Sequence, residues 1–286
     1  MIQLFKHHVH QESIDNVVTA LKSGWTGLGP RTEAFENKVK EYLDTPCAVA
    51  LNSGTSALQL AMLLLNAPKG SYIITTPLTF ISTNHCIVQA GSIPIFADIQ
   101  PSTGNIDPMS IERLLKQPFV GSRVKGIVVV HYGGQPVDMD EVYDLSNKYN
   151  IDVVEDAAHA FGAEYQNSKI GCKHSKLVAF SFHSVKPFAI GDGGLITTYE
   201  PAFEPILKQL RWCGIDKSTS DRYTKTSYKW DYNISMVGFK YHMNDIQAAI
   251  GLGQLANFEA DQVYKQTLVD LYRTQLQDIP QIEMLE

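Results

Sequence analysis

The stretch GIVVVHYGGQPVDMDEVYDLSNKYNIDVVEDA, at residues 126–157, decides the fold class. It contains an apolar run at 126–132, a helical pattern at 138–149 and a second apolar run at 151–157. Nearly continuous valine and isoleucine are typical of a strand that is buried on both faces of a sheet. Two such strands joined by a helix form a parallel pair with a right-handed crossover.

The same alternation recurs on both sides of this unit. Further strands are expected at 48–52, 72–76, 93–99, 177–183 and 194–199, and further helices at 56–66, at 81–90 and from about 107. The pattern predicts an α/β fold, a three-layer α/β/α sandwich with a mostly parallel sheet. Apolar residues then recur at helical spacing from 244 to about 277 and predict one long helix.

The composition restricts the possible partners and the compartment. The formal net charge of −6 over 286 residues gives no general attraction to nucleic acid or to an anionic membrane, so neither is expected as a partner. No apolar run approaches the roughly 20 residues that span a bilayer, and the N-terminus lacks a signal-peptide core. The four cysteines form no CxxC pair. We therefore expect free thiols in a cytoplasmic protein, and no metal site.

The segment SGTSAL, at residues 53–58, follows an expected strand and opens an expected helix. Free amides at a helix N-terminus, the helix dipole and nearby hydroxyls together form an anion site. Gly54 would let the backbone approach a phosphate closely, and Thr55 follows it. The alternative is an ordinary helix cap, because serine and threonine are preferred at that position in any case.

Two acidic residues, Glu155 and Asp156, end the strand expected at 151–157. Open α/β sheets bind ligands at this edge, and a carboxylate buried there requires a partner. A metal ion or a protonated ring nitrogen would both serve as that partner. His159 follows three residues later, and a lone histidine is more often a packed side chain than a functional one.

Lys186 ends the segment SFHSVK, at residues 181–186, beside the Gly-rich turn at 191–194. Partial burial would lower the pKa of this lysine and leave more of the neutral amine that attacks carbonyl groups. The alternative is a lysine with a buried stem whose charged end reaches water at the sheet edge. The turn is not a dinucleotide-binding fingerprint, because no GxGxxG opens a helix after the first strand.

Several groups of complementary chemistry fall at expected strand ends. They are Gly54 and Thr55 for a phosphate, Phe80 for stacking on a ring, the Asp156 carboxylate, the Ser181 hydroxyl and the Lys186 amine. Pyridoxal 5′-phosphate needs these groups: its phosphate is anchored, its ring is stacked, its ring nitrogen is kept protonated and its aldehyde is held by an amine. We therefore predict this cofactor.

Seven motifs carry a resemblance to a known family. In chain order they are SGTSAL, TPLTFIST, HYGGQPVDM, VVEDAAHAFGA, SFHSVK, GDGG and GFKYHMNDIQAAIGLGQL. This order resembles that of the DegT/DnrJ/EryC1/StrS family of pyridoxal-phosphate-dependent aminotransferases, which act on nucleotide-linked keto-sugars. The resemblance runs from about Trp25 to Leu255 and implies the fold-type I, aspartate aminotransferase-like architecture.

The resemblance also implies roles for individual residues. Lys186 would be the Schiff-base lysine and the general base, and Asp156 would pair with the pyridinium nitrogen. Phe80 would stack on the ring, and His159 would lie near the ring hydroxyl. The phosphate would be held by Gly54, Thr55 and Ser181.

Family members are dimers, in which a segment like 233–242 reaches the neighbour's cofactor phosphate. The resemblance thus implies a homodimer in which Lys240 serves as a point charge to phosphate, although many relatives have Asn and Arg where this chain has Lys240 and His242. Trp25 resembles an aromatic of the family's N-terminal loop near the sugar, and the alternative is a core anchor for the N-terminal arm. His183 is a second candidate for substrate contact.

The implied reaction moves an amino group from glutamate to a nucleotide-linked 3- or 4-keto-sugar, in cell-surface polysaccharide or amino-sugar biosynthesis. Lys186 argues against the sister group of sugar 3-dehydratases, which has histidine at this position. We expect a large cofactor-binding domain with an N-terminal arm at 1–243. At 244–286 we expect a linking helix and the start of a small C-terminal domain that is largely absent. A second hypothesis is therefore a non-catalytic protein that binds the cofactor or has a regulatory or dimerising role.

Overall fold

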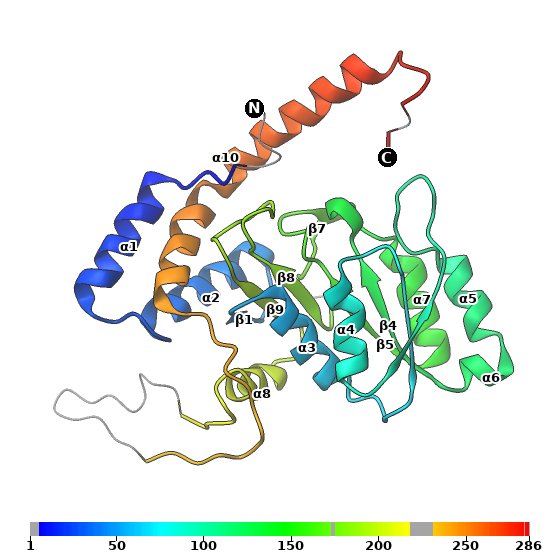
Figure 1. Ribbon diagram of the computed structural model, residues 1–286, viewed down its shortest axis with the longest axis horizontal. Helices are drawn as coiled ribbons and strands as arrows, with labels where there is room; N and C mark the ends of the chain where they lie inside the picture. Colours follow the sequence, from blue (N-terminus) through cyan, green and yellow to red (C-terminus); the bar gives the residue numbers. More distant parts are fainter. Residues whose placement is uncertain (1–5, 173–174, 218–230, 283, 286) are drawn as a thin grey trace.

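Helices cover both faces of one twisted sheet in the computed structural model (Figure 1). The structure describes all residues except 1–5, 173–174, 218–230, 283 and 286. Within the described residues the sheet has seven strands, in the order β1-β9-β8-β5-β4-β2-β3. Their bounds are β1 Cys47–Leu51, β2 Tyr72–Thr75, β3 Ile93–Phe96, β4 Val124–Val130, β5 Asp152–Asp156, β8 Val178–Ser181 and β9 Gly194–Thr198.

Strand direction confirms the predicted mostly parallel sheet. β9 pairs antiparallel with β1 and with β8, and every other pair in this sheet is parallel. The Gly-rich turn therefore belongs to a reversal of the chain between β8 and β9. All seven strands were predicted from their apolar runs. A short hairpin of β6 (Glu164–Tyr165) and β7 (Ser168–Lys169) lies apart from the sheet.

The helices confirm most of the predicted helical segments. They are α1 Gln11–Ser23, α2 Pro30–Leu43, α3 Gly54–Leu65, α4 Ile81–Gln89, α5 Pro108–Leu115, α6 Pro118–Gly121, α7 Met139–Tyr149, α8 Phe203–Leu210 and α10 Asp245–Leu276, with a 3-10 turn at Tyr132–Gly134. Side chains of Ser53, Asp107 and Asn244 cap the starts of α3, α5 and α10. Of these helices, α1, α2, α6 and α8 were not predicted.

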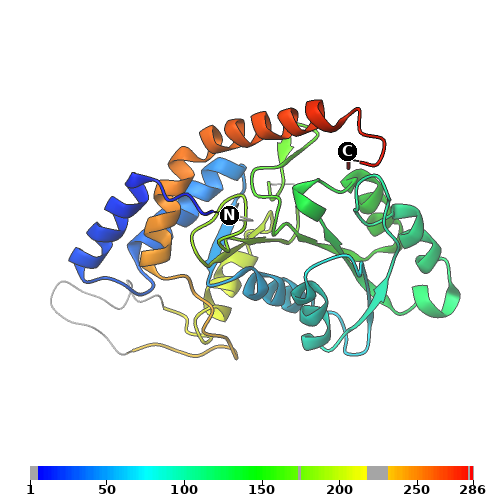
Figure 2. The same cartoon turned by 45° about the horizontal axis from the view of Figure 1, so that its top comes forward.

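Alternation of side chains along the strands defines the three layers. One face of the sheet carries Val49, Leu51, Ile73, Val128, Val154, Ala179 and Ile196 and packs on α3, α4 and α8. The opposite face carries Ala48, Ala50, Ile74, Ile127, Val129, Val153, Val178, Phe180 and Leu195 and packs on α2, α5, α7 and α10. Figure 2 shows α10 running across this second face, beside α1 and α2. The predicted α/β/α sandwich is thus confirmed.

A buried ion pair lies along the outer edge of β1. Glu36 of α2 contacts Arg211, which follows α8, and both residues are at most 5% exposed. Glu36 accepts the amide of Ala50 at 2.8 Å, and Arg211 donates to the carbonyl of Ala50 at 2.9 Å. The pair thus satisfies both backbone groups of Ala50, which point away from β9. It also fixes the strand that leads into Ser53 and Gly54.

We predict that Glu36→Ala destabilises the protein by about 3–5 kcal/mol, because it leaves the Arg211 charge buried without its partner. The double variant Glu36→Leu/Arg211→Met should be closer to the wild type, since it removes both charges. Chemical denaturation monitored by circular dichroism measures both values. A change below about 0.5 kcal/mol in Glu36→Ala, the range of ordinary surface substitutions, would contradict this role.

Candidate functional site

A cavity of about 560 Å³ opens where five parallel strands end. Its lining comes from the residues that follow β1, β2, β4, β5 and β8, and these strands share one direction. Eight of the predicted site residues line it: Gly54, Thr55, Phe80, Asp156, His159, Ser181, His183 and Lys186. The carboxyl ends of parallel strands are where open α/β sheets bind ligands.

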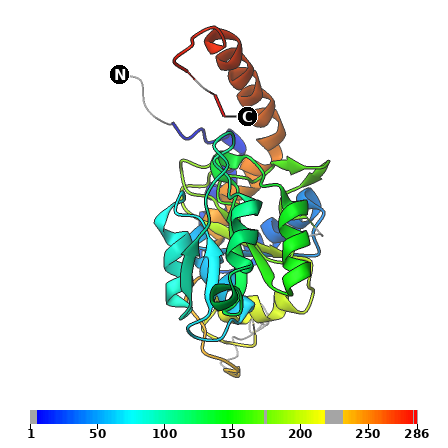
Figure 3. The ribbon, with the colours of Figure 1, turned by 90° about the vertical axis from the view of Figure 1, so that its right-hand side faces the viewer.

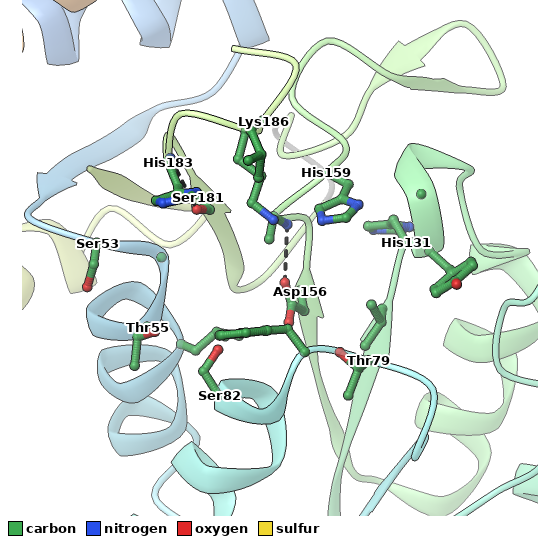
Figure 4. Close-up of a pocket in the computed structure, with 18 of the residues that line it drawn as sticks. Ser53, Thr55, Thr79, Ser82, His131, Asp156, His159, Ser181, His183 and Lys186 are labelled. Atoms are coloured by element: carbon green, nitrogen blue, oxygen red, sulfur yellow. Dashed lines mark hydrogen bonds between the residues drawn. The ribbon is translucent and has the colours of Figure 1, made fainter. Parts of the chain in front are cut away.

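The first turn of α3, which we call the cradle, lies on one side of the cavity (Figure 4). Ser53 caps the helix by accepting the Ser56 amide at 3.1 Å. The amides of Gly54 and Thr55 lie in the first turn, where no carbonyl of the helix can accept them. A Cβ on Gly54 would lie 2.7 Å from the Cβ of Ser181. Glycine is thus required for this approach of α3 to the end of β8. The cap reading of the motif is confirmed by the Ser53–Ser56 bond, and the phosphate reading stays a prediction.

Asp156 lies at the floor of the cavity and is 4% exposed. Thr83 donates its hydroxyl to one carboxylate oxygen at 2.6 Å, and the Ala158 amide donates to the other at 3.1 Å. Burial raises the pKa of Asp156, while these two donors and the nearby His159 and Lys186 act in the opposite direction. A cation at the open end of the cavity would stabilise the ionised carboxylate.

Lys186 descends from the loop after β8 into the cavity, toward Asp156 and beside His159 (Figure 4). Burial lowers the pKa of Lys186, and the charge of Asp156 offsets this in part. The pKa of His159 is lowered by burial and then by Lys186. Both groups therefore favour their neutral forms more than the same side chains would in water, which suits a lysine amine that must react with a carbonyl.

Phe80 lines the cavity and is nevertheless 72% exposed. It occupies the cap position before α4 in an extended backbone conformation. An aromatic ring left uncovered at the mouth of a cavity offers a stacking surface for a planar ligand. His183 is also exposed at this rim.

Two predicted residues do not line the cavity. Lys240 is exposed, and its ammonium lies 3.3 Å from the centroid of the Trp212 ring. Trp25 lies between α1 and α2, where its indole donates to the Leu28 carbonyl at 3.1 Å and covers Gly29. Both readings of Trp25 stay predictions, and the phosphate role of Lys240 would require a second copy of the chain.

A histidine that was not predicted as a site residue forms part of the cavity wall. His131 accepts the Val137 amide at Nδ1, so its proton resides on Nε2, which lies 3.1 Å from Glu155. Tyr143 donates to the other oxygen of Glu155. Both ring nitrogens of His131 are thus engaged away from the cavity, and it shapes the wall without transferring protons. The register that pairs β4 with β5 creates this contact.

The donor set fits a phosphorylated aromatic aldehyde such as pyridoxal phosphate. The cradle excludes even a methyl group at Gly54, Phe80 is uncovered, and the buried Asp156 lacks a full counter-charge. Among the described residues no group of three or more His, Cys, Asp or Glu side chains is placed to hold a metal ion. No helix in the described part of the chain is long and apolar enough to cross a membrane.

Comparison with known proteins gives the same family as the motifs. The model of the DegT/DnrJ/EryC1/StrS aminotransferase family matches residues 7–286. The spore coat polysaccharide biosynthesis protein SpsC of Bacillus subtilis is 37% identical over 272 residues, which are 95% of this chain and 68% of SpsC.

Solved structures extend the similarity to the fold. The sugar aminotransferase CalS13 of Micromonospora echinospora has a TM-score of 0.87 and 30% identity, covering 100% of this chain and 76% of CalS13. Spr1654 of Streptococcus pneumoniae in its PLP form has a TM-score of 0.86 and 27% identity, covering 97% of this chain and 72% of Spr1654.

We predict that Gly54→Ala weakens binding of pyridoxal phosphate. The added carbon would force α3 and Ser181 apart, and such overpacking costs about 1–3 kcal/mol, or roughly 5- to 150-fold in the dissociation constant. Titration of the cofactor-free protein measures the effect. Gly27→Ala is the matched control, because a Cβ there would meet no atom within 4 Å. Equal affinities for Gly54→Ala and the wild type would exclude the cradle.

We also predict that Lys186→Met stabilises the cofactor-free protein at neutral pH. The folded pKa of Lys186 lies below the ordinary 10.5, so folding disfavours its charged form, and stability rises as the pH passes through the window between these two values. The variant's higher melting temperature should therefore disappear as the pH approaches 10.5. Thermal unfolding across pH tests this, with the exposed Lys38→Met as the control. A gain in melting temperature that is the same at every pH would contradict the explanation by burial of the Lys186 charge.

Proposed function

The chain belongs to the DegT/DnrJ/EryC1/StrS aminotransferase family and is a pyridoxal-phosphate-dependent aminotransferase, and from this premise we propose that it moves an amino group from glutamate to a nucleotide-linked keto-sugar. The reaction would take place at carbon 3 or 4 of the sugar, in amino-sugar or polysaccharide biosynthesis. The observation that carries the proposal is the Lys186 amine in one cavity with a buried carboxylate and an anion cradle. Family membership favours this enzyme over a non-catalytic protein.

Each part of the cofactor has a corresponding group in the cavity. The phosphate would lie on the cradle of Gly54, Thr55 and Ser181, and the ring would lie on Phe80 with its nitrogen toward Asp156. When bound, pyridoxal phosphate supplies a carbonyl carbon that takes up amines and a ring that accepts electrons.

Lys186 would be both the anchor of the cofactor and the base. In its neutral form its Nζ can take a proton from the α-carbon of glutamate, and it can deliver a proton to the sugar carbon that receives the amine. The overall exchange balances, since glutamate becomes 2-oxoglutarate and the keto-sugar becomes an amino-sugar. Burial that keeps the pKa of Lys186 low supports both roles.

Asp156 would remain ionised opposite a protonated ring nitrogen. The hydrogen bonds from Thr83 and Ala158 hold both of its oxygens in place and add to the stabilisation of its charge. Because the carboxylate is buried and held at both oxygens, it would need little reorganisation during the reaction. His159 lies beside Lys186 and would face the ring hydroxyl.

We also propose a homodimer in which Lys240 of one copy approaches the cofactor phosphate in the other. Its exposure and its absence from the lining of its own cavity support this arrangement, as does the nearby Val237, which is 91% exposed. The division into a large domain at 1–243 and a second unit starting with α10 belongs to the same proposal. In this proposal α10 would link the large domain to the residues that follow it.

We expect Lys186→Ala to lower the rate of glutamate-dependent amination by roughly 10²- to 10⁴-fold, which is the usual contribution of a general base. The assay offers a panel of nucleotide-linked 3- and 4-keto-sugars and identifies amino-sugar products by mass spectrometry. Lys38→Ala, a substitution on the surface of α2, is the control. Undiminished turnover by Lys186→Ala would exclude the proposed base. A wild type that aminates no keto-sugar in the panel would exclude the substrate class.

A further inference from the structure

The loop that carries Lys186 is held from outside by side chains of α10. This loop, residues 182–193, joins β8 to β9. Lys265 donates to the carbonyl of Pro187 at 2.7 Å, and Gln247 donates to the carbonyl of Asp192 at 2.8 Å. A longer contact of 3.4 Å joins Gln254 to the carbonyl of Ala189.

These donors, together with Phe258, form one stripe on α10. Positions 247, 254, 258 and 265 are separated by seven, four and seven residues, which correspond to about two, one and two helical turns. The fourth member of the stripe, Phe258, is buried and packs edge-on against Phe188 of the loop at 5.4 Å. The same face of one helix thus contacts the loop through both its backbone and its core side chain.

Lys265 holds the backbone position nearest to the reactive lysine. On the upstream side, the Lys186 amide donates to His183 at 2.8 Å. On the downstream side the next residue is Pro187, which has no amide to donate. The first backbone group beyond the Lys186–Pro187 peptide bond that can form a hydrogen bond is therefore the Pro187 carbonyl. Lys265 donates to this carbonyl.

Lys265 is also where α10 leaves the body of the protein. Its side chain is partly buried, and its ammonium lies 5.5 Å from the centroid of Phe258. Residues 266–275 are all exposed, and Figure 3 shows this outer part of α10 standing clear of the layers. Lys265 also contacts Gln262, one turn earlier on the same helix. Of the four residues in the stripe, Lys265 is the one next to this exposed outer part of α10.

We propose that Lys265 is a positioning residue for Lys186: by holding the Pro187 carbonyl, it lets α10 set how the reactive amine is presented to the cavity. The inference rests on the proposed role of Lys186. Its consequence is that a shift of α10 is passed to the backbone of the residue next to Lys186. A displacement of about 1 Å at a reacting group can cost roughly 100-fold in rate, so the contact matters even though it lies outside the cavity.

The test compares Lys265→Met with Lys265→Arg, which keeps a donor, and with Arg273→Met, which removes an exposed charge from the same helix. Hydrogen exchange of the peptide that covers 182–193 is measured on the cofactor-free protein. Loss of a hydrogen bond from a charged donor should speed this exchange by roughly tenfold or more in Lys265→Met. With the cofactor bound, kcat should fall by a similar factor while KM for both substrates stays within about twofold. Lys265→Arg should recover most of both effects, and Arg273→Met should show neither.

Unchanged exchange and unchanged kcat in Lys265→Met would overturn the proposal. Faster exchange spread over the whole chain would overturn it as well, because Lys265 would then be a general stabilising residue. If Lys265→Met does not fold, Lys265→Gln, whose side chain is shorter and uncharged, provides the same local comparison. The exchange measurement does not depend on catalysis. Turnover that survives in Lys186→Ala would therefore refute the proposed function and leave the result on the loop intact.

Discussion

The common direction of five strands is the constraint on which the site depends. Because β1, β2, β4, β5 and β8 run parallel, the residues that follow them meet at one edge, although they are far apart in the sequence. A cradle, an uncovered ring, a carboxylate and an amine are thereby collected without any of them being neighbours in the chain. The reversal into β9 then turns the Lys186 loop back over this edge.

Burial gives these groups their chemical character. Asp156 is buried and Lys186 is partly buried, so burial raises the pKa of the acid and lowers the pKa of the amine. Each group is costly for folding in its charged form. For Lys186 this favours the neutral, reactive amine, and for Asp156 it favours a cation as the partner. The surrounding layers offset the cost with apolar packing and with the Glu36–Arg211 pair that fixes β1.

Local patterns predicted the sheet well because each strand is an apolar run closed by a turn or a helix start. They also placed six of the site residues at strand ends, and the family resemblance added His159 and His183. They missed contacts that depend on register and tertiary packing. The His131–Glu155 contact arises from the alignment of β4 with β5, and Lys265 meets a carbonyl 78 positions away. Thr83 lies within a motif of the family resemblance, but only the fold shows its bond to Asp156.

The most direct test of the central claim is to locate the covalent attachment of the cofactor. The wild-type protein is incubated with pyridoxal phosphate, reduced with borohydride, digested and mapped by mass spectrometry. The account predicts a phosphopyridoxyl group on Lys186 and on no other lysine of the chain. Attachment at a different lysine, or a protein that shows no attachment after reduction, would contradict it.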